Sequence, residues 1–115
     1  MPLKDLNKRR EYRREYYKQN KAIMDIRSGQ QTVKARERNT KYIKEYLNTH
    51  PCVDCGMKDL RTLDFDHVKG QKYKNISLMR IKGASLNRLI AEINKCEVRC
   101  ANCHRIITYE RRIAE

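Results

Sequence analysis

Trp, Phe and long apolar stretches are scarce in this 115-residue chain. It has no Trp and a single Phe, and 39 % hydrophobic residues stand against 36 % charged ones. No apolar run approaches the roughly 20 residues that a membrane-spanning helix needs, so a membrane partner is poorly supported. A chain of this size and composition buries only a modest hydrophobic core. We therefore expect one domain at most, stabilised by some additional cross-link.

Acidic residues are few relative to basic ones. The chain has 14 Asp and Glu against 27 Lys and Arg, a net charge of +13. Such an excess favours a polyanionic partner, because each phosphate that the protein neutralises releases counterions. We expect that partner to be nucleic acid, although an inert basic surface is the alternative. The first residues, Met-Pro-Leu-Lys-Asp, lack the apolar segment of a secretory signal, which predicts a cytoplasmic location.

Glycine and proline are rare as well, with four and two residues, and they punctuate the chain. Residues 6–27 contain neither and are predicted to form a helix. The segment Ser28-Gly29-Gln30-Gln31 predicts a break. A second helix is expected over residues 32–47. It should end at His50-Pro51, because the residue before a proline disfavours helical backbone.

Charge and cysteine content change at Pro51. Residues 1–50 hold 14 Lys and Arg against 6 acidic residues and no Cys. Residues 51–115 hold 13 against 8 and all five Cys. We therefore predict two parts, a basic helical arm at residues 1–50 and a domain at residues 51–115.

The second part shows alternating strand and helix patterns. Residues 61–68 alternate apolar and polar side chains, which is typical of a strand. Ser85 looks like the N-cap of a short helix that carries Leu86, Leu89, Ile90 and Ile93 on one face. Residues 96–99 predict a second strand, and a terminal helix is expected from Ala101 onward. The predicted fold class is therefore α+β.

Five cysteines in a reducing compartment indicate a metal site before they indicate disulfides. Four of them form two C-x-x-C pairs, which are Cys52 with Cys55 and Cys100 with Cys103. Four thiolates complete the tetrahedral shell of a structural Zn²⁺ and leave no open position for water. A redox dithiol, unrelated buried thiols, or His50 in place of one ligand are the alternatives. Cys96 is left over and is interpreted as a small buried apolar residue.

The residues around these pairs carry a family resemblance. The motifs, in chain order, are Cys52-x-x-Cys55, Leu63-x-Phe65-Asp66-His67 and Lys95-Cys96-x-Val98-x-Cys100-x-Asn102-Cys103-His104-Arg105. Over residues 52–108 the chain resembles the HNH endonuclease family, in particular the small forms encoded by phages. The resemblance implies the ββα-metal fold, also called the His-Me finger, in which a two-stranded hairpin and a helix hold one divalent ion.

The resemblance also implies roles for individual residues. Asp66 and His104 match the ligands of the catalytic ion, expected to be Mg²⁺ or Mn²⁺, and His67 matches the general base. Lys95 stands where the family has its middle Asn, so Asn94 or Asn102 become candidates for that role. Asp64 is expected to support the site by hydrogen bonding rather than as a ligand.

The chemistry of phosphodiester hydrolysis explains why Asp and His would be needed at such a site. The reaction needs an activated water and a cation for the charge that develops on the phosphate. His is the side chain whose ordinary pKa suits proton transfer near pH 7. Successive strand residues point to opposite faces, so Asp66 and His67 would need a local twist or bulge to serve one pocket.

Basic residues in both parts are candidates for phosphate contacts. They are Arg9, Arg10, Arg13 and Arg14 in the arm, and Lys69, Lys72 and Arg105 beside the motifs. Tyr residues between the arm cations could stack on bases, or pack on the domain or on a second copy. The predicted function is DNA hydrolysis, by nicking or double-strand cleavage, as a monomer or homodimer in the host cytoplasm if a phage encodes the protein. The alternatives are a non-catalytic zinc-finger protein that binds nucleic acid and a relative that acts on RNA.

Overall fold

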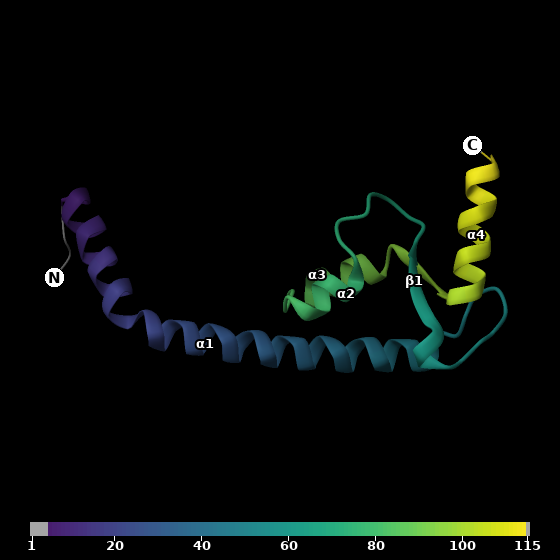
Figure 1. Ribbon diagram of the computed structural model, residues 1–115, viewed down its shortest axis with the longest axis horizontal. Helices are drawn as coiled ribbons and strands as arrows, with labels where there is room; N and C mark the ends of the chain where they lie inside the picture. Colours follow the sequence, from purple (N-terminus) through teal and green to yellow (C-terminus); the bar gives the residue numbers. More distant parts are fainter. Residues whose placement is uncertain (1–4, 115) are drawn as a thin grey trace. The chain divides into compact units, whose positions relative to one another are not determined.

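The computed structural model describes residues 5–114, which form a mixed α+β chain (Figure 1). Its elements, in order, are α1 (Leu6–Thr49), the 3₁₀ turn η1 (Leu60–Thr62), β1 (Leu63–His67), α2 (Ile76–Ile81), α3 (Leu86–Ile93), β2 (Cys96–Cys100) and α4 (Ala101–Ala114). Packing divides the chain into two compact units, Met1–Val33 and Lys34–Glu115. The change of composition at Pro51 therefore falls inside the second unit.

The predicted helix break at residues 28–31 is wrong, because α1 is continuous through this segment. A lone Gly in a helix costs only about 1 kcal/mol relative to Ala, and the neighbours of Gly29 are polar residues that a helix tolerates. The predicted stop is confirmed, because α1 ends at Thr49, directly before His50-Pro51. Thr49 Oγ1 donates to the carbonyl of Tyr46 at 3.1 Å and satisfies one of the last helical acceptors.

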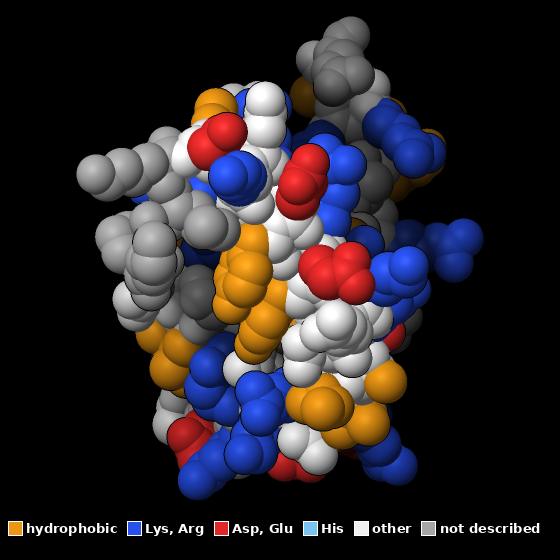
Figure 2. All heavy atoms as spheres, turned by 90° about the vertical axis from the view of Figure 1, so that its left-hand side faces the viewer, with side chains coloured by type: hydrophobic (Ala, Val, Ile, Leu, Met, Phe, Trp, Pro, Cys, Tyr) orange, Lys and Arg blue, Asp and Glu red, His pale blue; other side chains and the backbone are white. Residues whose placement is uncertain are grey.

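The first unit is the amino-terminal stretch of α1, most of whose side chains are exposed. Its Tyr12 and Tyr16 rings stack with centroids 6.4 Å apart. The molecular face in Figure 2 carries Lys and Arg side chains interspersed with exposed hydrophobic ones. No helix in the described part of the chain has the length and hydropathy needed to cross a bilayer.

The two predicted strands exist and pair with each other. β1 and β2 are antiparallel, in an unbroken register from Leu63 opposite Cys100 to His67 opposite Cys96. Because side chains alternate along a strand, Asp64 and Asp66 share one face with Glu97 and Arg99. His67 therefore extends from the opposite face, and the regular register contains no bulge between it and Asp66.

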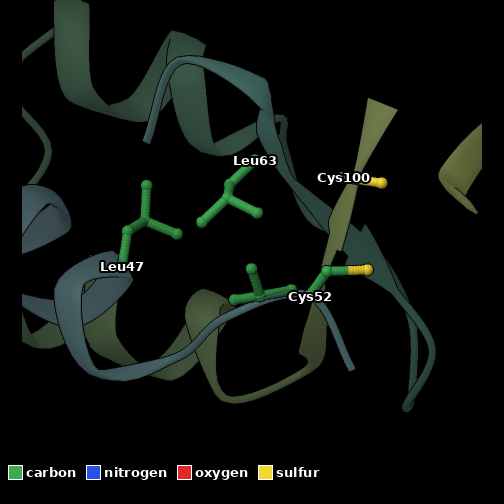
Figure 3. Close-up of a cluster of buried hydrophobic side chains, with 5 residues drawn as sticks. Leu47, Cys52, Leu63 and Cys100 are labelled. Atoms are coloured by element: carbon green, nitrogen blue, oxygen red, sulfur yellow. The ribbon is translucent and has the colours of Figure 1, made fainter. Parts of the chain in front are cut away.

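The core of the second unit consists of two small hydrophobic clusters. One contains Leu47, Cys52, Leu63, Val98 and Cys100, and the other contains Ile76, Met79, Leu89 and Ile93. Tyr46, Ile43 and Phe65 pack against both clusters and join them. In Figure 3 the sulfurs of Cys52 and Cys100 point away from the Leu47 and Leu63 side chains. Cys52 and Cys100 are thus buried members of the first cluster whose sulfurs point away from its leucines.

The helical elements around the sheet are as predicted in two cases out of three. Ser85 caps α3, and its hydroxyl accepts the N–H of Arg88 at 3.4 Å. α4 begins at Ala101, immediately after β2. α2 was not predicted, because its six residues are too few for a helical period to be visible in the sequence.

Candidate functional site

Four cysteines meet at the junction of the α1–β1 loop, β2 and α4. The Sγ atoms of Cys52, Cys55, Cys100 and Cys103 all lie within 4.8 Å of one another. The Sγ atoms of Cys55 and Cys100 are 3.6 Å apart, and thiolates around a tetrahedral Zn²⁺ are about 3.8 Å apart. The predicted cluster is thus present in a geometry that could hold a metal ion such as zinc.

The local backbone explains how the first pair forms a knuckle. The N–H of Gly56 donates to the carbonyl of Cys52 at 2.9 Å, and the N–H of Cys52 donates to the carbonyl of Met57 at 3.0 Å. Gly56 has a φ of 77°, a left-handed conformation that side chains with a Cβ rarely adopt. The turn therefore directs Cys52 and Cys55 to the same point.

The electrostatics of the cluster also favour a cation. Burial raises the pKa of Cys52, but backbone N–H groups near its sulfur outweigh this effect and lower the pKa to about 6. The pKa of Cys103 is raised, because its thiol shares hydrogen bonds with the sulfurs of Cys100 and Cys55. Four thiols this close together cannot all ionise unless a cation binds between them. The donor set therefore fits a dication.

Cys96 and His50 lie outside this cluster. Cys96 is half-buried in β2, and burial followed by the charge of Glu92 raises the pKa of its thiol to about 11. The ring of His50 stacks on Tyr46 with centroids 3.8 Å apart. Cys96 thus remains a protonated packing residue, as its sequence context suggested.

All three residues predicted for catalysis line one cavity. This cavity has a volume of about 600 Å³ and is bounded by Asp66, His67 and His104 together with Asp64. The remaining polar residues that line it are Lys72, Asn75, Ser77 and Arg80. Asp66 and His67 thus reach one cavity without the bulge that the strand alternation had suggested.

Asp66 is the most buried polar group of the cavity, with 4 % of its surface exposed. Arg99 Nη1 donates to its Oδ2 at 2.6 Å, and Arg111 donates to both oxygens at 3.1 and 3.0 Å. Burial opposes the charge of Asp66, but Arg111, His104 and Arg99 outweigh it and hold the pKa below its usual value. Asp66 is therefore a carboxylate that joins β1 to β2 and α4.

His104 lies in the first turn of α4, between the two carboxylates of β1. Its Nδ1 is 3.2 Å from Asp64 Oδ2, and its Nε2 is 3.5 Å from Asp66 Oδ1. Neighbouring ligands of an octahedral Mg²⁺ are about 3 Å apart, so the Asp66–His104 spacing suits a shared ion. Arg111 already binds the same Asp66 oxygen, so such an ion would compete with it. Among the described residues, only the four cysteines form a close group of three or more candidate ligands.

His67 is held by a partner that sequence reasoning missed. Its Nε2 lies 2.9 Å from Oε2 of Glu92, which is 2 % exposed. Glu92 comes from α3, three residues after Leu89 on the face that packs into the core. An acidic residue on an apolar helical face was the available signal, because such a residue is buried only when it has partners.

The candidates for the middle Asn do not reach the cavity. Asn94 caps the end of α3, and Asn102 is exposed on α4. Lys95 binds Glu92 Oε1 at 2.9 Å and the carbonyl of Gln71 at 3.0 Å. Asn75, which the sequence did not single out, lines the cavity at the start of α2.

The predicted phosphate contacts are distributed over several surfaces. Lys72 lines the cavity, and Arg80, which was not predicted, lines it too. Lys69 is exposed in the loop after β1, and Arg105 borders a separate hollow on α4 together with His104. The four arginines at positions 9, 10, 13 and 14 are exposed on α1 in the first unit.

No protein-family model, curated protein or solved structure gives a significant match to this chain.

Proposed function

We propose that this protein is a metal-dependent endonuclease of the HNH type that hydrolyses DNA phosphodiester bonds. The observation that supports this most is that Asp66, His67 and His104 all line one cavity. β1, β2 and α4 would then be the ββα-metal core, with the cysteine cluster beside it. The net charge of +13 fits a DNA substrate.

In this proposal His67 is the general base. It accepts a proton from a water molecule, whose oxygen attacks the phosphorus while the 3′ oxygen leaves, so that the product carries a 5′-phosphate. Asp66 and His104 would hold the catalytic Mg²⁺ or Mn²⁺, which supplies stabilisation for the charge on the phosphate. Lys72 and Arg80 line the same cavity and would neutralise the charge of the substrate.

The cysteine cluster has a different role in this proposal. Zn²⁺ bound by Cys52, Cys55, Cys100 and Cys103 would tie the α1–β1 loop to the end of β2 and to the first turn of α4. His104 directly follows Cys103, so the cluster sets its position relative to β1. The two metals would differ in kind, because thiolates select zinc and oxygen ligands select Mg²⁺ or Mn²⁺. A reducing cytoplasm would keep the thiols available for zinc.

A plasmid-relaxation assay with Mg²⁺ or Mn²⁺ tests the proposal. His67→Ala should reduce nicking by about 10²- to 10⁴-fold, which is what general bases usually contribute. His50→Ala is the matched control, because His50 lies outside the cavity and should leave the rate within about 2-fold. Equal rates for His67→Ala and the unmodified protein would show that His67 is not the base.

A second candidate is a non-catalytic zinc protein that binds nucleic acid. It is favoured by the arginines that already pair with both oxygens of Asp66, since a binding module needs no metal there. Metal titration separates the two candidates. A binding module takes up one tight Zn²⁺ per chain, whereas the nuclease also shows a weaker site for Mn²⁺ that Asp66→Asn removes.

A further inference from the structure

Glu92 of α3 is a buried carboxylate with three donors around it. Lys95 Nζ donates to Oε1 at 2.9 Å, and the backbone N–H of Tyr73 donates to Oε2 at 3.0 Å. The third partner is Nε2 of His67, 2.9 Å from Oε2. The side chain of Glu92 is 3 % exposed and that of His67 15 %, so water screens this contact little.

These partners keep Glu92 ionised. Burial alone would raise its pKa, but Lys95, the Tyr73 N–H and His67 together outweigh burial, and the pKa lies below its usual value. An ionised carboxylate only accepts hydrogen bonds. The hydrogen in the contact must therefore sit on Nε2 of His67. In neutral imidazole the other nitrogen, Nδ1, then carries the free lone pair.

The surroundings of His67 agree with this assignment. His67 lines the cavity that Asp66 and His104 also line. Over residues 5–114, the hydrogen bonds of His67 involve Nε2 and the backbone, and no group bonds to Nδ1. Nδ1 is therefore the ring nitrogen left for a proton from solvent or substrate.

We propose that Glu92 is a positioning residue that holds His67 in the Nε2–H tautomer and makes Nδ1 the proton-accepting atom of the cavity. The catalytic role of Nδ1 in this proposal rests on the nuclease function proposed above. It also assigns a task to Lys95, which stands where the resemblance expects an Asn. Lys95 binds Glu92 rather than the base, so orientation of the base passes from Lys95 through Glu92 to His67.

Glu92→Gln is the sharpest variant, because it keeps the shape of the side chain and removes one acceptor. Glu92 accepts on both oxygens, whereas Gln has one oxygen and one NH₂ group. If the Gln oxygen faces Lys95, its NH₂ faces His67 Nε2 and donates to it, which favours the Nδ1–H tautomer. If the oxygen faces His67 instead, the NH₂ opposes the Lys95 ammonium. Either arrangement weakens the hold on the ring.

The first measurement is the tautomer of His67, read from the ¹⁵N chemical shifts and two-bond couplings of ¹⁵N-labelled protein with zinc bound. The unmodified protein should show the Nε2–H form, and Glu92→Gln should show the Nδ1–H form or a mixture. Glu45→Gln, the same change at an exposed position of α1, should show the Nε2–H form. An Nδ1–H form in the unmodified protein, or an unchanged tautomer together with an unchanged kcat in Glu92→Gln, would overturn the proposal.

The second measurement is plasmid nicking in a double-mutant cycle. Glu92→Gln should lower kcat by roughly 10- to 100-fold with KM within about 2-fold, a loss no larger than a general base contributes. In a His67→Ala background, Glu92→Gln should have no further effect, because a residue that acts through His67 cannot act without it. A further loss in that background would indicate a merely structural role and overturn the proposal.

The two measurements also separate this inference from the proposed function. If the unmodified protein does not cut DNA, the nuclease proposal fails, and the tautomer measurement still decides the role of Glu92. If the protein cuts DNA but His67 is in the Nδ1–H form, only the inference about Glu92 fails. Circular dichroism of each variant confirms that the compared proteins are folded.

Discussion

Arg111 donates two hydrogen bonds to Asp66, which lies 45 residues earlier in the chain, with Nη1 3.1 Å from Oδ1 and Nη2 3.0 Å from Oδ2. The contact joins the last turn of α4 to the face of β1 that carries Asp64 and Asp66. Two parallel hydrogen bonds between a guanidinium and a carboxylate are the strongest form of this pair. Asp66 is thus held on two sides, since Arg99 also binds its Oδ2.

Arg111→Ala should destabilise the fold modestly. Removing one partner of a buried charge costs about 1–3 kcal/mol. We expect about 1 kcal/mol, because Arg99 still pairs with Asp66 and the Arg111 side chain is 45 % exposed. Urea unfolding measures the change. Arg112→Ala is the control, since Arg112 is exposed beside it, and equal losses in both variants would mean that the Asp66 contact adds nothing.

The same variant should bind a divalent ion more tightly if Asp66 and His104 are its ligands. Arg111 binds the Asp66 oxygen nearest to His104. Replacing Arg111 by Ala therefore frees that oxygen as a ligand and removes a positive charge that competes with the ion. We expect a several-fold lower Kd for Mn²⁺ in a calorimetric titration at saturating zinc. Since a tenfold change in Kd corresponds to about 1.4 kcal/mol, the gain in binding free energy should be a few tenths to about 1 kcal/mol. An unchanged Kd would place the ion elsewhere.

Cys100→Ser should abolish tight zinc binding, whereas Cys96→Ser should not. The Cys100 sulfur belongs to the cluster of four, and the Cys96 thiol instead donates to the carbonyl of Glu92 at 3.4 Å. Losing a ligand of a structural zinc removes binding energy that stabilises the fold. Metal analysis should find about one zinc per chain in the unmodified protein and in Cys96→Ser, and thermal melting should show a lower Tm for Cys100→Ser. Zinc loss from both variants would contradict the assignment of Cys100, and not Cys96, as a zinc ligand.

Glu92→Gln should also flatten the dependence of stability on pH in acid. The folded pKa of Glu92 lies below its usual value of about 4.3, so its contribution is complete above about pH 5. That contribution is lost as the pH falls through the lowered folded pKa. The unfolding midpoint in urea should therefore drop less between pH 5 and pH 3 in Glu92→Gln than in Glu45→Gln. Parallel curves for the two variants would show that the charge of Glu92 does not stabilise the fold.

Replacing the arginines at positions 9, 10, 13 and 14 by Ala tests the arm as a DNA contact. Each lost phosphate contact should reduce the slope of log K against log salt by about 0.9 for duplex DNA. The nicking rate at saturating DNA should stay within about 2-fold, because these residues lie in the first unit and the cavity lies in the second. Fluorescence anisotropy at several salt concentrations measures the slope. An unchanged slope would show that these four arginines do not contact DNA phosphates.

The sequence alone determined the features that depend on local spacing. The cysteine pairs, the cap at Ser85, the apolar face of α3 and both strands follow from periods and motifs within a few residues of each other. The helix break at Gly29 was predicted wrongly. A Gly in a helix costs about 1 kcal/mol, and the neighbouring turns of α1 stabilise the helix by more than this.

Only the tertiary structure decided which charges face each other. Asp66 pairs with Arg111 and His67 pairs with Glu92 across 45 and 25 residues, and no local period encodes such distances. Burial then sets the strength of these contacts, because a charge removed from water depends on its partners far more than one at the surface. The residues of the cavity could thus be named in part from sequence motifs, but their partners depended on how β1, α3 and α4 pack.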